Sequence, residues 1–476
     1  MKVCIVAEGS YPYIAGGVSS WLHQLISNFK EHDFILITLM PDNKRKGKFV
    51  YDLPDNIVGI RELSLSNMLN SKGKWNKKIA LTESDYIQLK NLLSFKKVEW
   101  DKLFNTFQEI KKSKLSGSDI QKSQVFYNAV QEAYMENFTH IPFTQVYWAF
   151  RSMYTIILEL LLLDYPNADI YHSVSTGYAG LIGSYAAKLN KKSFILTEHG
   201  IYTREREEEI IKAEWVKGYL KDLWIKYFYQ LSNCAYMTAD KVISLFEYNK
   251  EIQVEIGCPR EKISVIPNGI NITNYSEIAE IVSSRKDVKE FSVGAVVRVV
   301  PIKDIITMLE SFSIVNKDID KVHFYIMGPT EEEPEYYKQC LKVKDNLRLE
   351  NVSFVGRINI KDYFKKMNLL VLTSISEGQP LVILEGLASK LPFVATDVGD
   401  CKSLILGHND EFGPAGRISK VMDSVSIAKN IIELLKNQDL RTKYGEAGYK
   451  RVSEKYRFED FIYKYRELYT NYGLRD

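Results

Sequence analysis

The chain has 476 residues, more than one hydrophobic core normally serves, so two domains are expected. Hydrophobic residues make up 45% of the chain and charged residues 26%, as in ordinary globular proteins. The formal net charge of +3 is too small to indicate a nucleic-acid-binding protein.

The first and second halves each contain a series of short apolar runs separated by helical patterns. The first series lies at 3–8, 34–40, 169–175, 193–200, 241–246 and 263–269, and the second at 291–300, 323–328, 352–356, 369–374 and 393–399. Continuous apolar runs that end in Gly, Ser or Asp and precede a helix are typical of parallel strands covered on both faces. The fold class predicted is therefore α/β, with two Rossmann-like domains.

Three segments fall outside these series. Residues 66–160 are rich in Lys, Gln, Asn and aromatic residues and show no clear strand, which predicts a helical insertion in the first domain. The polar stretch 271–290 is expected to link the domains. The predicted division is a first domain at 1–275, a second at 286–455, and a C-terminal helix at 456–476 that packs back on the first domain.

The cysteines and apolar runs also bear on location. The five cysteines form no CxxC pair, which favours a reducing compartment over a disulfide framework: Cys4, Cys234, Cys258, Cys340 and Cys401. The run 3–7 ends at Glu8, too early for a signal-peptide core. The longest apolar run, 156–163, contains Glu159, and crossing a bilayer takes about 20 apolar residues. We expect a cytoplasmic protein, with peripheral attachment to the inner face of a membrane left open.

The stretch SEGQPLVILEG (376–386) follows an apolar run and places two acids around a helix start. Pro380 fits the first helical position, and the backbone N–H groups and positive dipole end there suit a phosphate. Glu377 precedes the helix and Glu385 lies roughly 7.5 Å further along its axis. A ligand with a pyrophosphate at the helix start could meet one acid on each side, and a carboxylate accepts from vicinal hydroxyls. The alternative, a plain helix with Glu385 in solvent, is disfavoured by its leucine neighbours.

Two cations follow the strand predicted at 291–300. Arg298 and Lys303 are five residues apart across a turn begun by Pro301. At the carboxyl end of a strand, an Arg fork and a Lys point charge can neutralise a diphosphate. No metal-ligand cluster is visible in the sequence to do this. The alternative is two surface cations on a loop.

The first half offers weaker candidates. His199 ends a buried strand before Gly200, where it could donate a hydrogen bond to a sugar hydroxyl or a reacting carbonyl. His172 sits in a similar setting, and for both a structural role is the commoner case. Gly16 and Gly17 precede a helix and permit close approach of an anion or sugar. They do not form GxGxxG, which disfavours an NAD-dependent oxidoreductase.

Together these motifs resemble retaining family-4 glycosyltransferases of the GT-B fold. The resemblance rests on the E-x7-E spacing of Glu377 and Glu385, the Arg298–Lys303 pair, and the stretches VIPNGI, EHG and AGGVSSW. The first-half stretches EGSYPYIAGGVSSW, STGYAGLIG and LTEHGIYTRERE, with SISEGQPLVILEG, look like the PelF type, which serves Pel exopolysaccharide synthesis in biofilms. Gln379 departs from the bulky apolar residue of the wider family but agrees with the Pel type.

The resemblance implies two domains facing across a cleft, the first on the acceptor side and the second binding the nucleotide sugar. It implies a retaining, metal-independent hexosyltransferase without a cofactor. The expected donor is a UDP-sugar, UDP-glucose first, and the expected acceptor is a growing exopolysaccharide or related saccharide, served by a membrane-bound polysaccharide synthase complex. Which hexose, acceptor, linkage and oligomeric state apply, and whether UDP is preferred to GDP or ADP, stay open.

The resemblance also assigns roles. Glu385 holds the ribose hydroxyls, Glu377 the donor hexose, and Arg298 and Lys303 the leaving diphosphate, while His199 contacts the hexose. The implied catalytic residues are His199, Glu377, Arg298 and Lys303, and the donor-binding set adds Gly16, Gly17, Gly378, Gln379, Pro380, Leu381 and Glu385. The acceptor or sugar side has the candidates His172, Tyr202 and Arg204.

Two alternatives remain at this point, the first of them from a different class of protein. One is a catalytically silent sugar-nucleotide-binding subunit of a polysaccharide synthase complex. The other is a transferase like sucrose or glycogen synthase on the same fold. Acceptor assays separate the second alternative from the exopolysaccharide hypothesis.

Overall fold

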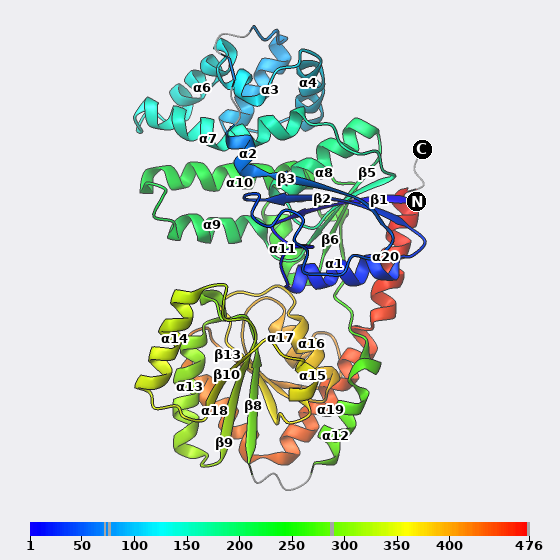
Figure 1. The fold of residues 1–476 in the computed structure, drawn as a ribbon, viewed down its shortest axis with the longest axis vertical. Helices are drawn as coiled ribbons and strands as arrows, with labels where there is room; N and C mark the ends of the chain where they lie inside the picture. Colours follow the sequence, from blue (N-terminus) through cyan, green and yellow to red (C-terminus); the bar gives the residue numbers. More distant parts are fainter. Residues whose placement is uncertain (71–72, 75–77, 286–289, 474–476) are drawn as a thin grey trace. The chain divides into compact units, whose positions relative to one another are not determined.

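The computed structural model describes residues 1–70, 73–74, 78–285 and 290–473 (Figure 1). The chain divides into two compact units, one of Met1–Ile266 with Tyr465–Asp476, the other of Pro267–Lys464. Each unit has its own parallel sheet and its own hydrophobic core. None of the described helices has the length and apolarity to cross a membrane.

The first unit is built on one parallel sheet in the order β3-β2-β1-β4-β5-β6-β7. Its strands are β1 (Lys2–Glu8), β2 (Asp33–Met40), β3 (Ile57–Ser64), β4 (Ile170–Ser173), β5 (Ser193–Glu198), β6 (Lys241–Ser244) and β7 (Ile263–Val265). The chain moves outward from β1 to β3 and then returns to the other side of β1, so the order reverses between β1 and β4. Open α/β sheets bind their ligands at such a reversal.

Helices cover this sheet, and α8 and α10 contribute many residues to its core. They are α1 (Gly17–Asn28), α8 (Gly177–Asn190), α9 (Tyr202–Lys212), α10 (Gly218–Thr238) and α11 (Glu247–Glu255). The end of helix α20 (Phe458–Gly473) belongs to this unit, where Tyr465 and Tyr469 are fully buried. The hydroxyl of Tyr465 lies 3.0 Å from that of Thr197 at the end of β5.

Between β3 and β4 the described residues form helices where the sequence predicts a helical insertion. They are α2 (Leu65–Leu69), α3 (Glu83–Leu93), α4 (Trp100–Lys112), α5 (Gly117–Gln121), α6 (Gln124–Asn137) and α7 (Phe143–Leu162). Helix α3 starts at a capping box, in which Thr82 and Asp85 bond each other's backbone N–H groups. Helix α4 buries Trp100, Leu103, Phe104, Phe107 and Ile110, which form one apolar stripe.

The insertion shares its core with the sheet-covering helices. The ring of Phe104 on α4 lies 5.2 Å from that of Tyr185 on α8, and both side chains are fully buried. Burying a side chain of this size contributes about 1.5–3 kcal/mol. The insertion is therefore part of the first unit and not a separate domain.

The second unit has a parallel sheet in the order β10-β9-β8-β11-β12-β13. The strands are β8 (Phe291–Val296), β9 (Val322–Met327), β10 (Val352–Gly356), β11 (Leu369–Leu372), β12 (Phe393–Thr396) and β13 (Gly416–Ser419). The order again reverses, here between β8 and β11, as in a dinucleotide-binding sheet.

Helices lie on both sides of the second sheet (Figure 1). Helices α13 (Ile305–Asp318), α14 (Pro334–Asn346) and α18 (Ser424–Lys436) pack together on one side. The others are α12 (Ser276–Ser284), α15 (Ile360–Phe364), α16 (Leu381–Ala388), α17 (Cys401–Leu406) and α19 (Gln438–Lys455). Because helices cover both faces of the sheet, side chains on both sides of each strand are apolar, and the strands appear in the sequence as continuous apolar runs.

The sequence missed some elements. Strands β3 and β13 lie at sheet edges. Strand β3 is mostly half-buried, and β13 has the sequence GRIS with Arg417 and Ile418 half-buried, so neither has a buried apolar run. The polar stretch expected as a linker contains helix α12, whose Ile278 is buried in the second core. Part of that stretch, 286–289, lies outside the described residues.

Candidate functional site

The candidate site of the second unit lies where the loops after β8 and β11 meet. These neighbouring strands are the point at which the strand order reverses, and their carboxyl ends share one edge of the sheet. Arg298 and Lys303 follow β8, and Glu377 follows β11. The topology thus brings together motifs that are far apart in the sequence.

Lys303 and Glu377 form an ion pair. Lys303 Nζ lies 2.5 Å from Glu377 Oε1, and the hydroxyl of Ser374 donates to the same oxygen at 2.5 Å. The side chains of Lys303 and Glu377 are only 16% and 11% exposed. Screening by water is weak there, so the Coulomb attraction between the two charges is stronger than in a surface ion pair. The sequence predicted both residues for the site but did not predict this contact.

The loop that carries Lys303 is fixed by the end of the next strand. The 3-10 turn Pro301–Lys303 starts at the predicted proline. The Thr373 hydroxyl donates to the carbonyl oxygens of Lys303 and Asp304, each at 3.0 Å, and the Ile375 N–H donates to Ile302 at 2.8 Å. These bonds fix the loop of Lys303 to the loop of Glu377 and so keep the two side chains close together.

Arg298 is held by a different carboxylate. Its Nη1 lies 2.7 Å from Glu332 Oε2, in the loop after β9, and both side chains are partly exposed. Arg357, which follows β10, pairs with Glu331 at 3.0 Å. The sequence analysis overlooked these acids, although an acidic run directly after a strand end is a usable signal.

The helix start at the two-glutamate motif differs by one residue from the prediction. Helix α16 begins at Leu381, and Pro380 is the N-cap with an extended ψ of 116°, where the sequence predicted it as the first helical residue. No described side chain caps this end. The first backbone N–H groups of α16 therefore lack a side-chain acceptor, as an anion-binding helix start requires.

Glu385 is not a solvated acid. Burial raises its pKa to about 7, while a hydrogen bond from Tyr275 and the charge of Lys361 pull the pKa back down in part. Burial chiefly, together with the same Glu385 carboxyl, raises the pKa of Tyr275 far above its ordinary value. Glu385 is half-buried on α16, so it is not the solvent-exposed acid of the alternative interpretation.

Gln379 does not offer its side chain to a ligand. It is 6% exposed, and its amide bonds the backbone N–H of Asn268 at 2.6 Å and the carboxyl of Asp400 at 2.7 Å. The resemblance assigns donor binding to the backbone N–H groups of this loop, and the side-chain amide of Gln379 is engaged within the protein.

In the first unit, Gly16 and Gly17 leave open space after β1. Gly16 has a φ of 173°, which any residue adopts, and a β-carbon on either glycine would meet no described atom within 4 Å. Neither backbone geometry nor packing by the described residues explains the missing side chains. A surface kept bare at the carboxyl end of β1 is what close ligand approach needs.

His199 is a neutral imidazole with a spare nitrogen. Burial lowers its pKa to about 3, so the ring carries no charge at physiological pH. Its ring packs edge-on against Trp21 with centroids 4.6 Å apart. Its Nε2 is buried without a hydrogen-bond partner among the described residues, which leaves one polar atom for a ligand.

The three candidates for the acceptor or sugar side do not gather at one place. His172 is fully buried and uses both ring nitrogens, at 2.8 Å each from the Tyr469 and Thr197 hydroxyls. Tyr202 is 7% exposed, and its hydroxyl donates to Glu8 at 3.1 Å. Arg204 is exposed and lies 3.4 Å from Glu255. The contacts of His172 and Tyr202 are those of core residues.

The sequence analysis did not single out two carboxyls at strand ends, the buried Glu198 and the half-buried Glu8. Glu198, the last residue of β5, accepts from the Tyr236 hydroxyl at 2.6 Å and from Gln253 at 2.9 Å, and burial raises its pKa to about 7. Burial also raises the pKa of Glu8, the last residue of β1. An acid that ends an apolar strand was the available signal.

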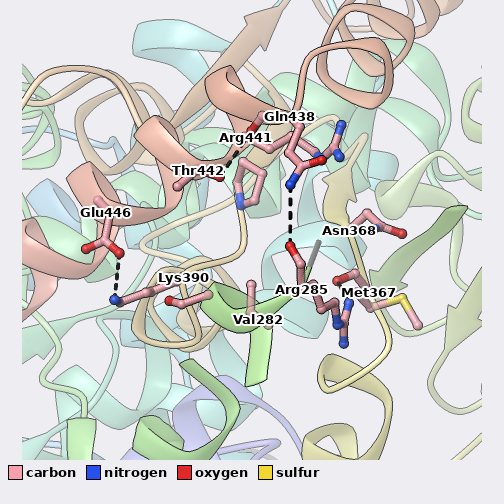
Figure 2. A pocket seen from close by; sticks show the side chains of 11 residues that line it. Val282, Arg285, Met367, Asn368, Lys390, Gln438, Arg441, Thr442 and Glu446 are labelled. Atoms are coloured by element: carbon pink, nitrogen blue, oxygen red, sulfur yellow. Dashed lines mark hydrogen bonds and ion pairs between the residues drawn. The ribbon is translucent and has the colours of Figure 1, made fainter. Parts of the chain in front are cut away.

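A small cavity of about 50 Å³ lies elsewhere in the second unit (Figure 2). It is lined by residues that precede β11 and β12, including Met367 and Pro392, so it opens at the amino ends of the strands. Charged side chains that line the cavity already have partners within the protein. Lys390 forms an ion pair with Glu446 at 2.6 Å, and Arg285 donates to the Met367 carbonyl at 2.8 Å. The cavity is not part of the candidate site.

Two family models match the chain. Residues 1–261 match the family described as Domain of unknown function (DUF3492), and residues 277–451 match Glycosyl transferases group 1. Because the first match spans more than half of the 476 residues, the chain belongs to the DUF3492 family, with a glycosyl transferases group 1 domain as its second part.

Relatives and solved structures agree with the assignment of a glycosyl transferases group 1 domain. The chain is 27% identical over 315 residues to an uncharacterized glycosyltransferase of Methanocaldococcus jannaschii, covering 65% of this chain and 77% of that protein. It is 25% identical over 331 residues to the capsular polysaccharide biosynthesis glycosyltransferase CapM of Staphylococcus aureus. This match covers 66% of this chain and 80% of CapM. Among solved structures, HepE of Anabaena has been determined with UDP and with UDP-glucose. Its UDP complex superposes on this chain with a TM-score of 0.61 at 14% sequence identity, and the match covers 99% of this chain and 100% of HepE.

The likeness to HepE confirms the predicted fold of two Rossmann-like α/β domains of the GT-B type. The glycosyltransferase relatives support a glycosyl-transfer activity.

The buried Glu198 predicts a pH dependence of stability. Its pKa of about 7 in the folded state exceeds the ordinary value of 4.5, so the folded state holds the proton more tightly than the unfolded state. This carboxyl therefore lowers the free energy of unfolding as pH rises from about 4.5 to above 7. Glu198→Gln should remove that part of the slope and stabilise the first unit at pH 8 by up to about 3 kcal/mol.

The measurement is urea unfolding followed by tryptophan fluorescence between pH 5 and 8. All six tryptophans lie before residue 225, so the signal reports the first unit. Glu109→Gln, at an exposed position on α4, is the control and should leave the slope unchanged. An identical slope in Glu198→Gln and the parent protein would contradict the role given to this carboxyl.

Proposed function

We propose that the protein is a retaining hexosyltransferase of the PelF type that moves glucose from UDP-glucose to a growing exopolysaccharide or related saccharide. The observation that carries the proposal is the Lys303–Glu377 pair, held by Ser374, at the strand-order reversal of a group 1 domain. HepE, solved with UDP and with UDP-glucose, supports the choice of donor.

The donor site is assigned to the second unit. Glu385 accepts the ribose hydroxyls, and Glu377 binds the donor hexose. Backbone N–H groups at Gly378, Gln379 and Leu381 seat the phosphate and sugar, while Pro380 fixes the helix start without an N–H of its own.

Lys303 connects the two halves of the donor. Its ammonium has three donors, so it can hold Glu377 and a phosphate oxygen at the same time. In that arrangement one cation orients the carboxylate that binds the hexose and also neutralises the group that leaves. Arg298 supplies the second cation once its guanidinium fork engages the diphosphate beside Glu332.

In the transfer step the bond between the anomeric carbon and the diphosphate oxygen breaks. The acceptor hydroxyl oxygen bonds to that carbon on the same face, and its proton passes to the leaving diphosphate, so no protein base is needed. Negative charge grows on the diphosphate as the bond breaks. Arg298, Lys303 and the start of α16 stabilise that charge, which is why no metal ion or other cofactor is proposed.

The first unit is proposed as the acceptor side, with the bare surface at Gly16 and Gly17 in contact with the acceptor. His199 reaches a sugar hydroxyl with its spare Nε2. The chain is proposed to work in the cytoplasm with a membrane-bound polysaccharide synthase complex, a proposal supported by its first-half motifs.

Nucleotide binding without a metal is the first expectation. UDP should bind equally well in EDTA and in excess Mg²⁺, because Arg298 and Lys303 supply the positive charge. Isothermal titration calorimetry with UDP, GDP and ADP measures this, and UDP should bind most tightly. Binding that disappears in EDTA would contradict the metal-free scheme.

Three variants separate the roles of the charged residues. Glu385→Ala should weaken UDP and UDP-glucose alike, by about 10- to 150-fold for one charge-assisted hydrogen-bond site worth about 1.5–3 kcal/mol. Glu377→Gln should keep or improve UDP affinity, because it removes a carboxylate from Lys303, and should still lower turnover. Lys303→Ala should weaken diphosphate binding and turnover together.

Lys342→Ala, which removes an exposed lysine from α14, is the matched control and should change nothing. The measurements are UDP calorimetry and turnover on variants shown to be folded by circular dichroism. If folded Glu377→Gln lost as much UDP affinity as Glu385→Ala, the two acids would be wrongly assigned.

A further inference from the structure

Gln379 is a polar residue buried in a loop that borders the donor site. It follows Glu377 and Gly378 and precedes the N-cap of α16, and it is 6% exposed. A buried amide is costly unless its donors and acceptors are satisfied. The contacts of Gln379 therefore show what this loop is attached to.

The Gln379 side chain joins two other segments of the second unit. Its Oε1 accepts from the backbone N–H of Asn268 at 2.6 Å, and its Nε2 donates to Asp400 Oδ2 at 2.7 Å. The Asn268 side chain returns a bond to the Gln379 carbonyl at 3.2 Å. Asn268 and Asp400 are 4% and 2% exposed, so the whole group is shielded from water.

The backbone of the same loop is held as well. The Asp400 N–H donates to the Gly378 carbonyl at 2.9 Å. Gly399 has a φ of +53°, and a β-carbon there would lie 2.3 Å from the carbonyl oxygens of Glu377 and Gly378. Only glycine permits this close approach, so the turn after β12 packs closely against the two peptide groups that follow Glu377.

Asn268 lies in the segment through which the chain enters the second unit, since the boundary falls between Ile266 and Pro267. The next residues are anchored too: Ile270 and Tyr456 share a backbone hydrogen bond of 2.8 Å. The donor-side loop is thus bonded to the entry segment on one side and to the loop after β12 on the other.

We propose that Asn268, Gln379 and Asp400 form a positioning clamp that sets the geometry of the Glu377–Leu381 loop for the nucleotide sugar. The inference rests on the proposed function, because the loop is taken to bind the donor. None of the three side chains is proposed to touch the substrate. They act through the backbone that aims Glu377 and the N–H groups at the start of α16.

The clamp also explains why glutamine stands where the wider family has a bulky apolar residue. An apolar side chain would take the acceptor from the buried Asn268 N–H and would leave the buried Asp400 carboxyl with one donor fewer, the Ser403 side chain remaining. Burial raises the pKa of Asp400 to about 6, so at pH 8 this carboxyl is ionised and needs the amide donor of Gln379.

A donor–acceptor swap tests the clamp at pH 8. Gln379→Glu replaces the amide donor with a second carboxylate facing Asp400, and it should lower turnover and UDP affinity by about 10-fold through loop displacement. Asp400→Asn keeps an acceptor for Gln379 and should stay within about twofold of the parent protein. The double variant Gln379→Glu/Asp400→Asn restores a donor and an acceptor, and both quantities should recover to within about threefold.

Gln379→Met keeps the volume without the polar bonds, and it decides the question if Gln379→Glu fails to fold. It should fold, lose about 10-fold in UDP affinity and lower kcat. Ile431→Val, a core change on α18, is the control for simple destabilisation: it should lower the thermal midpoint and leave UDP affinity unchanged.

The outcomes are separable. Folded Gln379→Met that binds UDP and turns over like the parent protein would overturn the clamp, as would a folded double variant without recovery. A parent protein that binds no nucleotide would overturn the proposed function itself. Loss in Gln379→Glu and Gln379→Met, with recovery in the double variant, supports the clamp.

Discussion

The ion pair between Lys303 and Glu377 depends on the adjacency of β8 and β11 in the second sheet. The strand order reverses there, so the loops after these strands meet without a crossing connection between them. Thr373, at the end of β11, bonds the backbone of the lysine loop and holds the two loops together. Helix α16 (Leu381–Ala388) follows the loop after β11, and the roles proposed for the second unit depend on this junction.

Buried polar groups recur around the carboxyl ends of the strands. Burial raises the pKa of Glu198 and Glu385 to about 7 and that of Asp400 to about 6. Each of these carboxyls has at least one hydrogen-bonding partner, so the cost of removing it from water is partly offset. Such groups order loops, because a shift of the loop would leave a buried carboxyl unpaired.

The fold was largely predictable from the sequence, because continuous apolar strands followed by amphipathic helices produce a local pattern. The two strands that the sequence analysis did not predict, β3 and β13, are edge strands. One side of an edge strand faces no neighbouring strand, and its apolar pattern is weaker. The site was predictable in part. Residue type and position after a strand pointed to Lys303, Glu377 and Glu385, whereas the same signals made His172 a candidate although it is a fully bonded core residue.

The sequence by itself determined the two α/β series, the helical insertion and the residues that can carry charge at strand ends, since these follow from local periodicity and side-chain chemistry. Tertiary structure decided which of those residues meet. Lys303 and Glu377 are 74 residues apart, and Asn268 and Gln379 are 111 apart. Such contacts depend on the order of the strands and on burial, which no local pattern encodes, because a side chain's neighbours across a sheet are chosen by how the whole unit packs.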